Sequence, residues 1–310
     1  MINLKNFLFD QAIVQTEDIF IGTIGYEIRS EYMLKQICKK INPKNILLFY
    51  FDDYCNFDRL KNEIDNIEAE YKMIERKYEE GDKVINDVVS FVKERYSEGA
   101  YIHLDYSSMP RNWYCYLPMG LHKLYPQKVI FWYVKGKYPI NYEVYPSSGI
   151  EAYSIIGTSS LRTEQKRMHV IGLGYDVIRT KALLSIMDPD LYSVCSAHDD
   201  LDQDIGDNVQ KMNFEIISQA FKSIEFNLDY FSFIYSKLCE MANEYSPIGD
   251  IIFVPDGPKP LIMAMALVPQ TIAKPGISCL LVSRNKSCYE PIMVEPTNKI
   301  IGFGLYDDGM

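Results

Sequence analysis

"IGTIGYEIRS" (residues 21–30) ends a short apolar run in glycine and then turns at once to polar residues. The segment that follows, "SEYMLKQICKKI" (30–41), carries apolar residues at helical spacing, and the next apolar run, "NILLFYF" (45–51), has the length of a strand. A strand, a glycine turn, a helix and a second strand form a βαβ unit, in which parallel strands are covered by helices.

The same alternation continues along the chain. In the first half, further strands are predicted at 72–78, 100–105 and 128–134, and helices at 57–71, 82–96 and between the last two strands. In the second half, strands are predicted at 168–174, 190–197, 250–256 and 277–283, and helices at 178–187, 209–223, 229–245 and 259–270. Residues 141–167 are rich in Gly, Pro and Ser. We therefore expect an α/β protein with two Rossmann-like units of mainly parallel sheet, at 1–140 and 168–310, joined by a linker or irregular excursion at 141–167.

The two halves have similar motifs. "IGLGYDVIRT" (171–180) matches "IGTIGYEIRS", and both place an Arg shortly after Gly-Tyr-acid. Gly25 lies 80 residues before Asp105, and Gly174 lies 82 residues before Asp256, so later polar breaks also align. Several agreements in register predict an internal duplication.

Composition excludes several classes of protein. A net charge of −10 opposes the coating of duplex DNA, which needs a basic surface. No apolar run approaches a membrane span, and the first residues lack the features of a signal peptide, so a cytoplasmic location is expected. The seven Cys contain no CxxC, and the four His form no cluster with zinc spacing. We expect neither a metal nor a cofactor.

Polar loops follow four of the predicted strands, where parallel sheets bind their ligands. The candidate ligand-binding residues are Gly25, Tyr26, Glu27, Arg29, Asp105, Ser107, Ser108, Arg111, Tyr175, Asp176, Arg179, Asp256, Gly257 and Lys259. Helix N-termini, hydroxyls and a guanidinium suit phosphate oxygens, and the acids suit ribose hydroxyls or base amino groups. The expected ligand is therefore a small anion, a nucleotide above all.

Simpler interpretations stay open for the same residues. Ser107 or Ser108 can be a plain helix N-cap, and Arg29 and Arg179 can pair with acids. The glycines can serve only tight turns, since no full GxGxxG is present. His103 lies inside a strand pattern and is interpreted as a core histidine.

"LDYSSMPR" (104–111) resembles the ligand-loop motif of CARF domains, the CRISPR-associated Rossmann fold, through D-x-S-x-x-x-R at Asp105, Ser107 and Arg111. "GYEIRS" takes the place of that family's loop after the first strand, and the resemblance covers about residues 18–135. It implies a sensor of cyclic oligoadenylates or a related nucleotide, bound between two α/β halves and acting in antiviral defence. It also implies a protein partner that carries an effector activity, because no effector motif is evident here. "PDGPKP" (255–260) lacks the Ser of the motif.

Two other classes of function remain open. A hydrolase or transferase acting on a nucleotide or sugar phosphate would use the same Arg, Lys and Ser for phosphoryl charge, with Asp105 or Asp256 as general base. A protein–protein scaffold would leave the loops as caps and turns. If the chain binds a ligand between its two units, we expect Arg111 and Lys259 to lie at one shared, locally positive cleft.

Overall fold

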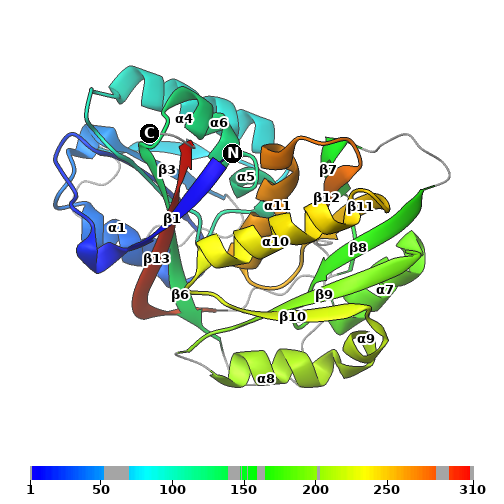
Figure 1. Cartoon of the computed structure of the whole chain (residues 1–310). Helices are drawn as coiled ribbons and strands as arrows, with labels where there is room; N and C mark the ends of the chain where they lie inside the picture. The colour runs from blue at the N-terminus through cyan, green and yellow to red at the C-terminus, as the bar shows by residue number, and fades with distance from the viewer. Residues whose placement is uncertain are drawn as a thin grey trace. The chain divides into compact units, whose positions relative to one another are not determined.

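The computed structural model describes residues 2–51, 70–138, 147, 149–151, 153–158, 165–200, 203–283 and 293–307. The chain divides into two compact units, each with its own sheet (Figure 1). The first unit comprises Ile2–Pro139 with Pro291–Met310, and the second comprises Ile140–Glu290. The predicted α/β fold with two mainly parallel sheets is confirmed.

The sheet of the first unit has the strand order β1-β13-β6-β5-β2-β3-β4. Its strands are β1 (Ile2–Leu8), β2 (Ile19–Ile24), β3 (Ile46–Tyr50), β4 (Lys72–Glu75), β5 (Ile102–Asp105), β6 (Val129–Lys137) and β13 (Glu295–Asp307). The strands from β6 to β4 are parallel, whereas β13 is antiparallel to both β6 and β1. The buried parallel strands are almost continuously apolar, as strands covered on both faces must be.

Helices cover this sheet because their apolar stripes face it. They are α1 (Arg29–Ile37), α4 (Gly81–Arg95), α5 (Arg111–Tyr114) and α6 (Leu117–Leu124), with short 3-10 helices at Phe9–Gln11 and Pro43–Asn45. Met33 and Leu34 of α1 pack with Phe20 of β2 and Trp132 of β6 in one buried cluster. This packing holds the start of α1 beside the end of β2.

The sheet of the second unit has the order β10-β9-β8-β11-β12-β7. Its strands are β7 (Tyr153–Thr158), β8 (Lys166–Gly172), β9 (Leu191–His198), β10 (Lys222–Asn227), β11 (Gly249–Val254) and β12 (Ile277–Val282). All pairs are parallel except β12 with β7. Its helices are α7 (Val177–Met187), α8 (Gln203–Met212), α9 (Phe214–Gln219), α10 (Phe231–Tyr245) and α11 (Lys259–Ile272).

The core of the second unit combines strand and helix side chains in the same way. Leu183 of α7, Val209 of α8 and Ile216 of α9 pack against Ile171 and Val194 of the sheet. Helix α11 is apolar all round and buried from Pro260 to Pro269, as expected for a helix with protein on every side.

Both sheets share one topology. Numbered along the chain within each unit, the five parallel strands run 3-2-1-4-5, with one antiparallel strand beside the fifth. A duplicated unit would give this match, although the duplication itself stays a prediction. The antiparallel strands are exchanged: β7 follows β6 along the chain but pairs with β12, and β13 follows β12 but pairs with β6.

The exchange changes the expected boundaries. The C-terminal segment of the predicted 168–310 unit lies in the first sheet as β13, and β7 and the start of β8 occupy part of the predicted 141–167 linker. The helix predicted at 209–223 divides into α8 and α9, and β10 begins at Lys222. The helix predicted at 57–71 lies almost wholly outside the described residues. Within the described parts of the chain, no helix is long and apolar enough to cross a bilayer.

Candidate ligand site at the switch points

The loops after β2 and β5 lie next to each other at the carboxyl edge of the first sheet. These two strands are adjacent and parallel, and the chain continues from β2 to β3 on one side and from β5 to β6 on the other. This is a topological switch point, where open α/β sheets bind their ligands. A Cβ at Gly25 would lie 3.7 Å from the Cβ of Ser108, so the predicted "GYEIRS" and "DYSSMPR" loops do meet.

Ser107 organises the loop after β5. Its backbone N–H donates to Oδ1 of Asp105 at 2.8 Å, and its hydroxyl donates to the same oxygen. Its Oγ also accepts a 2.7 Å hydrogen bond from the backbone N–H of Val134 in β6. Neither serine caps the following helix, because α5 begins at Arg111 after Pro110, and its N-cap has no side-chain hydrogen bond. Ser107 and Asp105 therefore hold the loop in shape.

Two hydroxyls at this edge are buried without a hydrogen-bond partner in the described structure. They are Oγ of Ser108, in the loop after β5, and Oγ1 of Thr23, one residue before the end of β2. An unsatisfied buried hydroxyl destabilises a protein by about 1–3 kcal/mol. A bound ligand with acceptor atoms would remove that penalty at Ser108.

Buried cations gather at the same edge. Arg29 is the first residue of α1, Arg111 is the first residue of α5, and Lys135 lies near the end of β6. Their relative exposures are 2%, 8% and 1%. Four Lys or Arg residues are buried in the part of the chain that the structure describes, and these are three of them.

Arg29 is fixed by its own loop and by β6. Its guanidinium donates to the carboxylate of Glu27 and, at 3.0 Å, to the hydroxyl of Tyr133, and lies 5.4 Å from the ring centroid of Tyr133. Burial alone would lower the pKa of Arg29, but Glu27, Tyr133 and Tyr138 together outweigh it and raise the pKa. Arg29 therefore stays charged at every physiological pH.

Several aromatic rings pack together next to Arg29 in the first unit. The ring of Tyr106, directly after β5, lies 5.6 Å from that of Tyr133 and 5.5 Å from that of Tyr114. Burial raises the pKa of Tyr106 and of Tyr114 well above the usual value, so both stay neutral. Surroundings of low polarity strengthen the electrostatic interactions of a buried charge.

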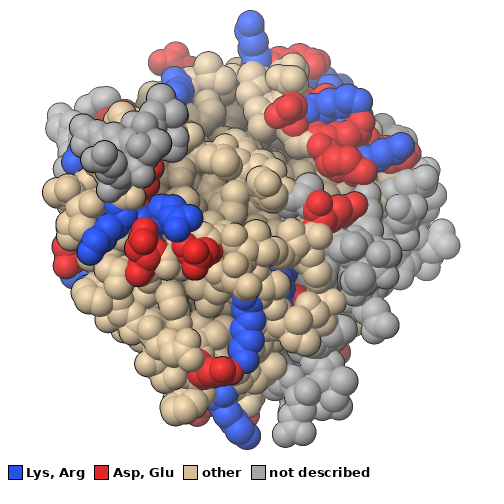
Figure 2. Space-filling view, turned by 90° about the vertical axis from the view of Figure 1, so that its right-hand side faces the viewer, with Lys and Arg blue, Asp and Glu red and all other residues tan. Residues whose placement is uncertain are grey.

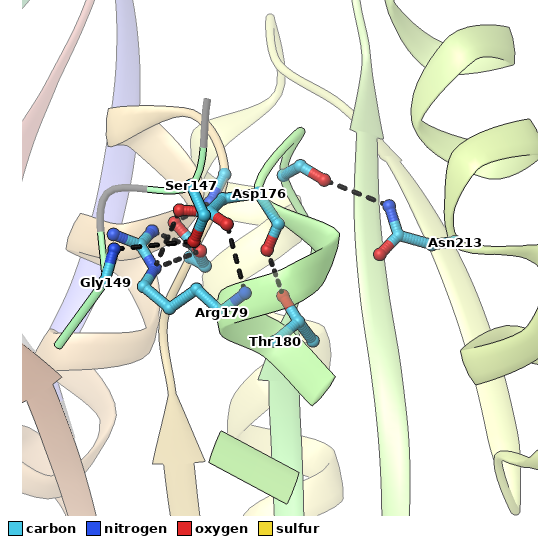
Figure 3. Close-up of polar contacts among 9 residues, drawn as sticks. Ser147, Gly149, Asp176, Arg179, Thr180 and Asn213 are labelled. Carbon is cyan, nitrogen blue, oxygen red and sulfur yellow. Dashed lines mark hydrogen bonds and ion pairs between the residues drawn. The ribbon is translucent and has the colours of Figure 1, made fainter. Parts of the chain in front are cut away.

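The second switch point lies between β8 and β11, and an ion pair spans it. Nε of Arg179, in α7, donates to Oδ2 of Asp256 at 3.2 Å, and Nη2 donates to the same oxygen. Asp176 caps α7 by accepting from the backbone N–H of Arg179 at 3.0 Å, and its Oδ2 lies 3.8 Å from Nε of Arg179. Figure 3 shows Arg179 and Asp176 at the start of α7, with Ser147 and Gly149 drawn beside them.

Backbone contacts close the same switch point. A Cβ at Gly172 would lie 2.5 Å from the carbonyl oxygen of Asp256, and one at Gly174 would lie 3.0 Å from the backbone nitrogen of Gly257. Gly257 has φ of +89°, a conformation that favours glycine. Asn213, before α9, donates to the carbonyl of Gly174 at 3.0 Å (Figure 3). The two loops are thus packed backbone to backbone.

The matching motifs make two matching contacts. The hydroxyl of Ser30 donates to the carbonyl of Glu27 at 2.7 Å, and the hydroxyl of Thr180 donates to the carbonyl of Asp176 at 3.1 Å. Each arginine also pairs with the acid of its own loop, Arg29 with Glu27 and Arg179 with Asp176. The two arginines differ because Arg179 pairs with Asp256 across the switch point as well.

The remaining candidates lie beside these groups. Tyr26 and Tyr175 are half-buried in the loops after β2 and β8, and Lys259 is the first residue of α11, after Pro258. Arg111 and Lys259 belong to different units, so their shared cleft stays a prediction.

Sequence reasoning missed Thr23, Tyr133, Lys135 and Asn213 at the two sites. For Lys135 a signal existed, because a lysine directly after the apolar run "VIFWYV" (129–134) marks a strand end. Thr23, inside an apolar strand, gave no signal that separates it from an ordinary buried threonine.

No protein-family model matches the chain, and no curated protein has a significantly similar sequence. Among the described residues, no group of His, Cys, Asp and Glu is arranged to hold a metal ion. On the face drawn in Figure 2, Lys and Arg lie beside Asp and Glu in small mixed groups.

Proposed function

We propose that the chain binds a phosphate-bearing nucleotide at the first switch point and acts as a CARF-like sensor in antiviral defence. The observation that carries the proposal is the gathering of Arg29, Arg111 and Lys135, all buried, where such sheets bind ligands. Phosphate oxygens form charge-assisted hydrogen bonds with lysine and arginine side chains, and a guanidinium group binds them bidentately.

The unpartnered hydroxyl of Ser108 supports the same proposal. It stands beside Gly25, where an added Cβ would make only an ordinary contact, so a ligand atom can approach the backbone. The resemblance of "LDYSSMPR" to the CARF ligand loop makes cyclic oligoadenylates the first nucleotides to test. A sensor of this kind would pass the signal to a protein partner that carries an effector activity.

Calorimetric titration at fixed moderate salt tests the proposal, with AMP, ATP and linear and cyclic oligoadenylates as ligands. We expect one of them to bind, and Arg111→Ala to weaken it by roughly tenfold or more, since charge-assisted hydrogen bonds contribute about 1.5–3 kcal/mol. Lys135→Met, which keeps the apolar stem, is the second variant in case Arg111→Ala misfolds. Arg167→Ala is the matched control, because that arginine is 51% exposed and pairs with Asp190.

Two results would contradict the proposal: no binding by any of these nucleotides, or equal affinities for wild type and both site variants. Chromatography of the bound nucleotide after incubation separates the two classes of function. An unchanged nucleotide supports a sensor, and a converted one supports a hydrolase or transferase at the same site.

A further inference from the structure

We infer that the two switch points have different roles: only the first takes a ligand, and the second is sealed by the chain's own groups. The ion pair of Arg179 with Asp256 spans the second switch point, whereas at the first an added Cβ on Gly25 would make only an ordinary contact. The inference rests on the proposed function for the first site, but the seal itself is a property of the second unit that can be measured without ligand.

The first argument is space. At the second switch point, Gly172 and Gly174 lie against the backbone of Asp256 and Gly257, at distances that exclude even a methyl group without a shift. A phosphate or a base is far larger than a methyl group, so it cannot enter between these loops. At Gly25 the nearest group to an added Cβ is the side chain of Ser108, at 3.7 Å.

The second argument is charge. Arg179 faces two carboxylates, those of Asp176 and Asp256, and all three residues are at most 5% exposed. A phosphate brought to this position would meet these two carboxylates, which already occupy Arg179. At the first switch point three buried cations lie at the same edge of the sheet as Glu27 and Asp105.

The third argument is that the sealing groups have structural partners. Oδ1 of Asp256 accepts from the backbone N–H of Gly257 at 2.9 Å, and Asp176 caps α7. Asn213 ties the carbonyl of Gly174 to the region before α9. Each of these bonds fixes a loop, so the second switch point has a structural role: it joins β8, β11 and α7.

Urea denaturation of the whole chain tests the seal. We expect Asp256→Asn and Arg179→Gln each to lower the urea midpoint by roughly 1 M or more, because removing one partner of a buried pair leaves the other uncompensated. The double variant should lose less than the sum of the two single variants. Gly172→Ala should lower Tm by roughly 2–4 °C or more, and Gly25→Ala, the control at the open site, should not.

Titration of the same variants with a cyclic oligoadenylate tests the division of roles. We expect one nucleotide to bind per chain. In buffer without urea, the affinities of Asp256→Asn and Arg179→Gln for it should lie within about twofold of the wild-type value. Two nucleotides per chain would overturn the inference. So would a tenfold loss of affinity in either variant with an unchanged urea midpoint. If no nucleotide binds to wild type, the proposed function fails, and the denaturation results alone decide whether the seal exists.

Discussion

Ser107 accepts a 2.7 Å hydrogen bond from the backbone N–H of Val134, and this bond ties the loop after β5 to strand β6. Its neighbour Ser108 has a buried hydroxyl with no partner in the described structure. Two adjacent serines thus differ: Ser107 holds the loop, and the hydroxyl of Ser108 makes no hydrogen bond in the described structure.

Ser107→Ala should lower the free energy of unfolding by about 1–3 kcal/mol, because the N–H of Val134 and the carboxylate of Asp105 both lose a partner. Urea denaturation followed by circular dichroism measures this change. Ser218→Ala is the control, since that hydroxyl is exposed and donates only to the carbonyl of Glu215. Equal midpoints for Ser107→Ala and wild type would contradict the structural role.

Ser108→Ala should leave the free energy of unfolding unchanged or slightly raised, because it removes an unsatisfied buried hydroxyl. Affinity for the nucleotide that the wild type binds should fall by about tenfold, the value of one hydrogen bond to a charged acceptor. Calorimetric titration of both proteins decides. A variant that binds as tightly as wild type would place Ser108 outside the site.

Asp18 and His103 form a buried pair in the first unit, with Nε2 of His103 at 3.2 Å from Oδ2 of Asp18. Nδ1 of His103 accepts from the indole of Trp132 at 3.0 Å, so His103 acts as a core residue. Burial raises the pKa of Asp18, but hydrogen bonds from His103 and from the N–H groups of Tyr101 and Gln15 outweigh it and lower the pKa. The stability that this carboxylate adds is therefore present above its unfolded pKa and lost as the pH falls through the lower, folded value.

Asp18→Asn tests this pair. We expect a loss of about 1–3 kcal/mol at pH 7, since the bond to His103 and two backbone bonds are disturbed. The difference from wild type should shrink below about pH 4, where Asp18 is protonated in the unfolded chain. Urea denaturation at both pH values measures it, and a difference that stays constant would refute the assigned titration.

His169 in β8 should make the protein sensitive to acid. Burial lowers the pKa of His169 to about 4, and Arg167 adds to the shift. The unfolded chain therefore binds the proton first as the pH falls below about 6.5, and stability decreases from there towards pH 4. Both ring nitrogens lack a hydrogen-bond partner in the described structure, so an apolar replacement leaves no group newly unpaired.

His169→Leu should thus gain about 2 kcal/mol relative to wild type between pH 8 and pH 5. Thermal or urea unfolding at the two pH values gives the comparison. The control is His198→Leu, because His198 is 34% exposed at the end of β9. A gain of the same size in both variants would show that burial of His169 is not the cause.

Gly302 of β13 should tolerate no side chain. It lies opposite Trp132 in the sheet, and a Cβ there would lie 2.5 Å from the indole ring. Gly302→Ala should lower the free energy of unfolding by about 1–3 kcal/mol, because the buried indole must move. Gly120→Ala is the control, since an added Cβ there meets nothing within 4 Å. Similar stabilities for these two variants would refute the tight packing.

The sequence predicted the parallel strands inside the sheets because both of their faces are buried, which makes runs such as "NILLFYF" (45–51) continuously apolar. It did not predict β1, β7, β10 and β13, whose sequences mix polar and apolar residues as edge or antiparallel strands do. Pairing with a distant strand decides those segments, and local periodicity does not encode the partner.

The same limit applies to the candidate site. The sequence found both pairs of loops, because glycine turns and polar clusters after apolar runs are local signals. It treated the two pairs as alike, since "GYEIRS" and "GYDVIRT" are alike. Arg179 differs from Arg29 because it also reaches Asp256, and those two residues lie 77 positions apart along the chain.

The position of β13 bears on when the first unit can fold during synthesis. Strand β13 lies between β1 and β6, yet it follows the whole of Ile140–Glu290 along the chain (Figure 1). A ribosome adds about 5–20 residues per second, and domains usually fold in order from the N-terminus. Here β6 has no partner on its outer side until translation has passed Asp307, so the edge of the first sheet is exposed while the second unit is being made. The half of the protein that is synthesised first is completed last.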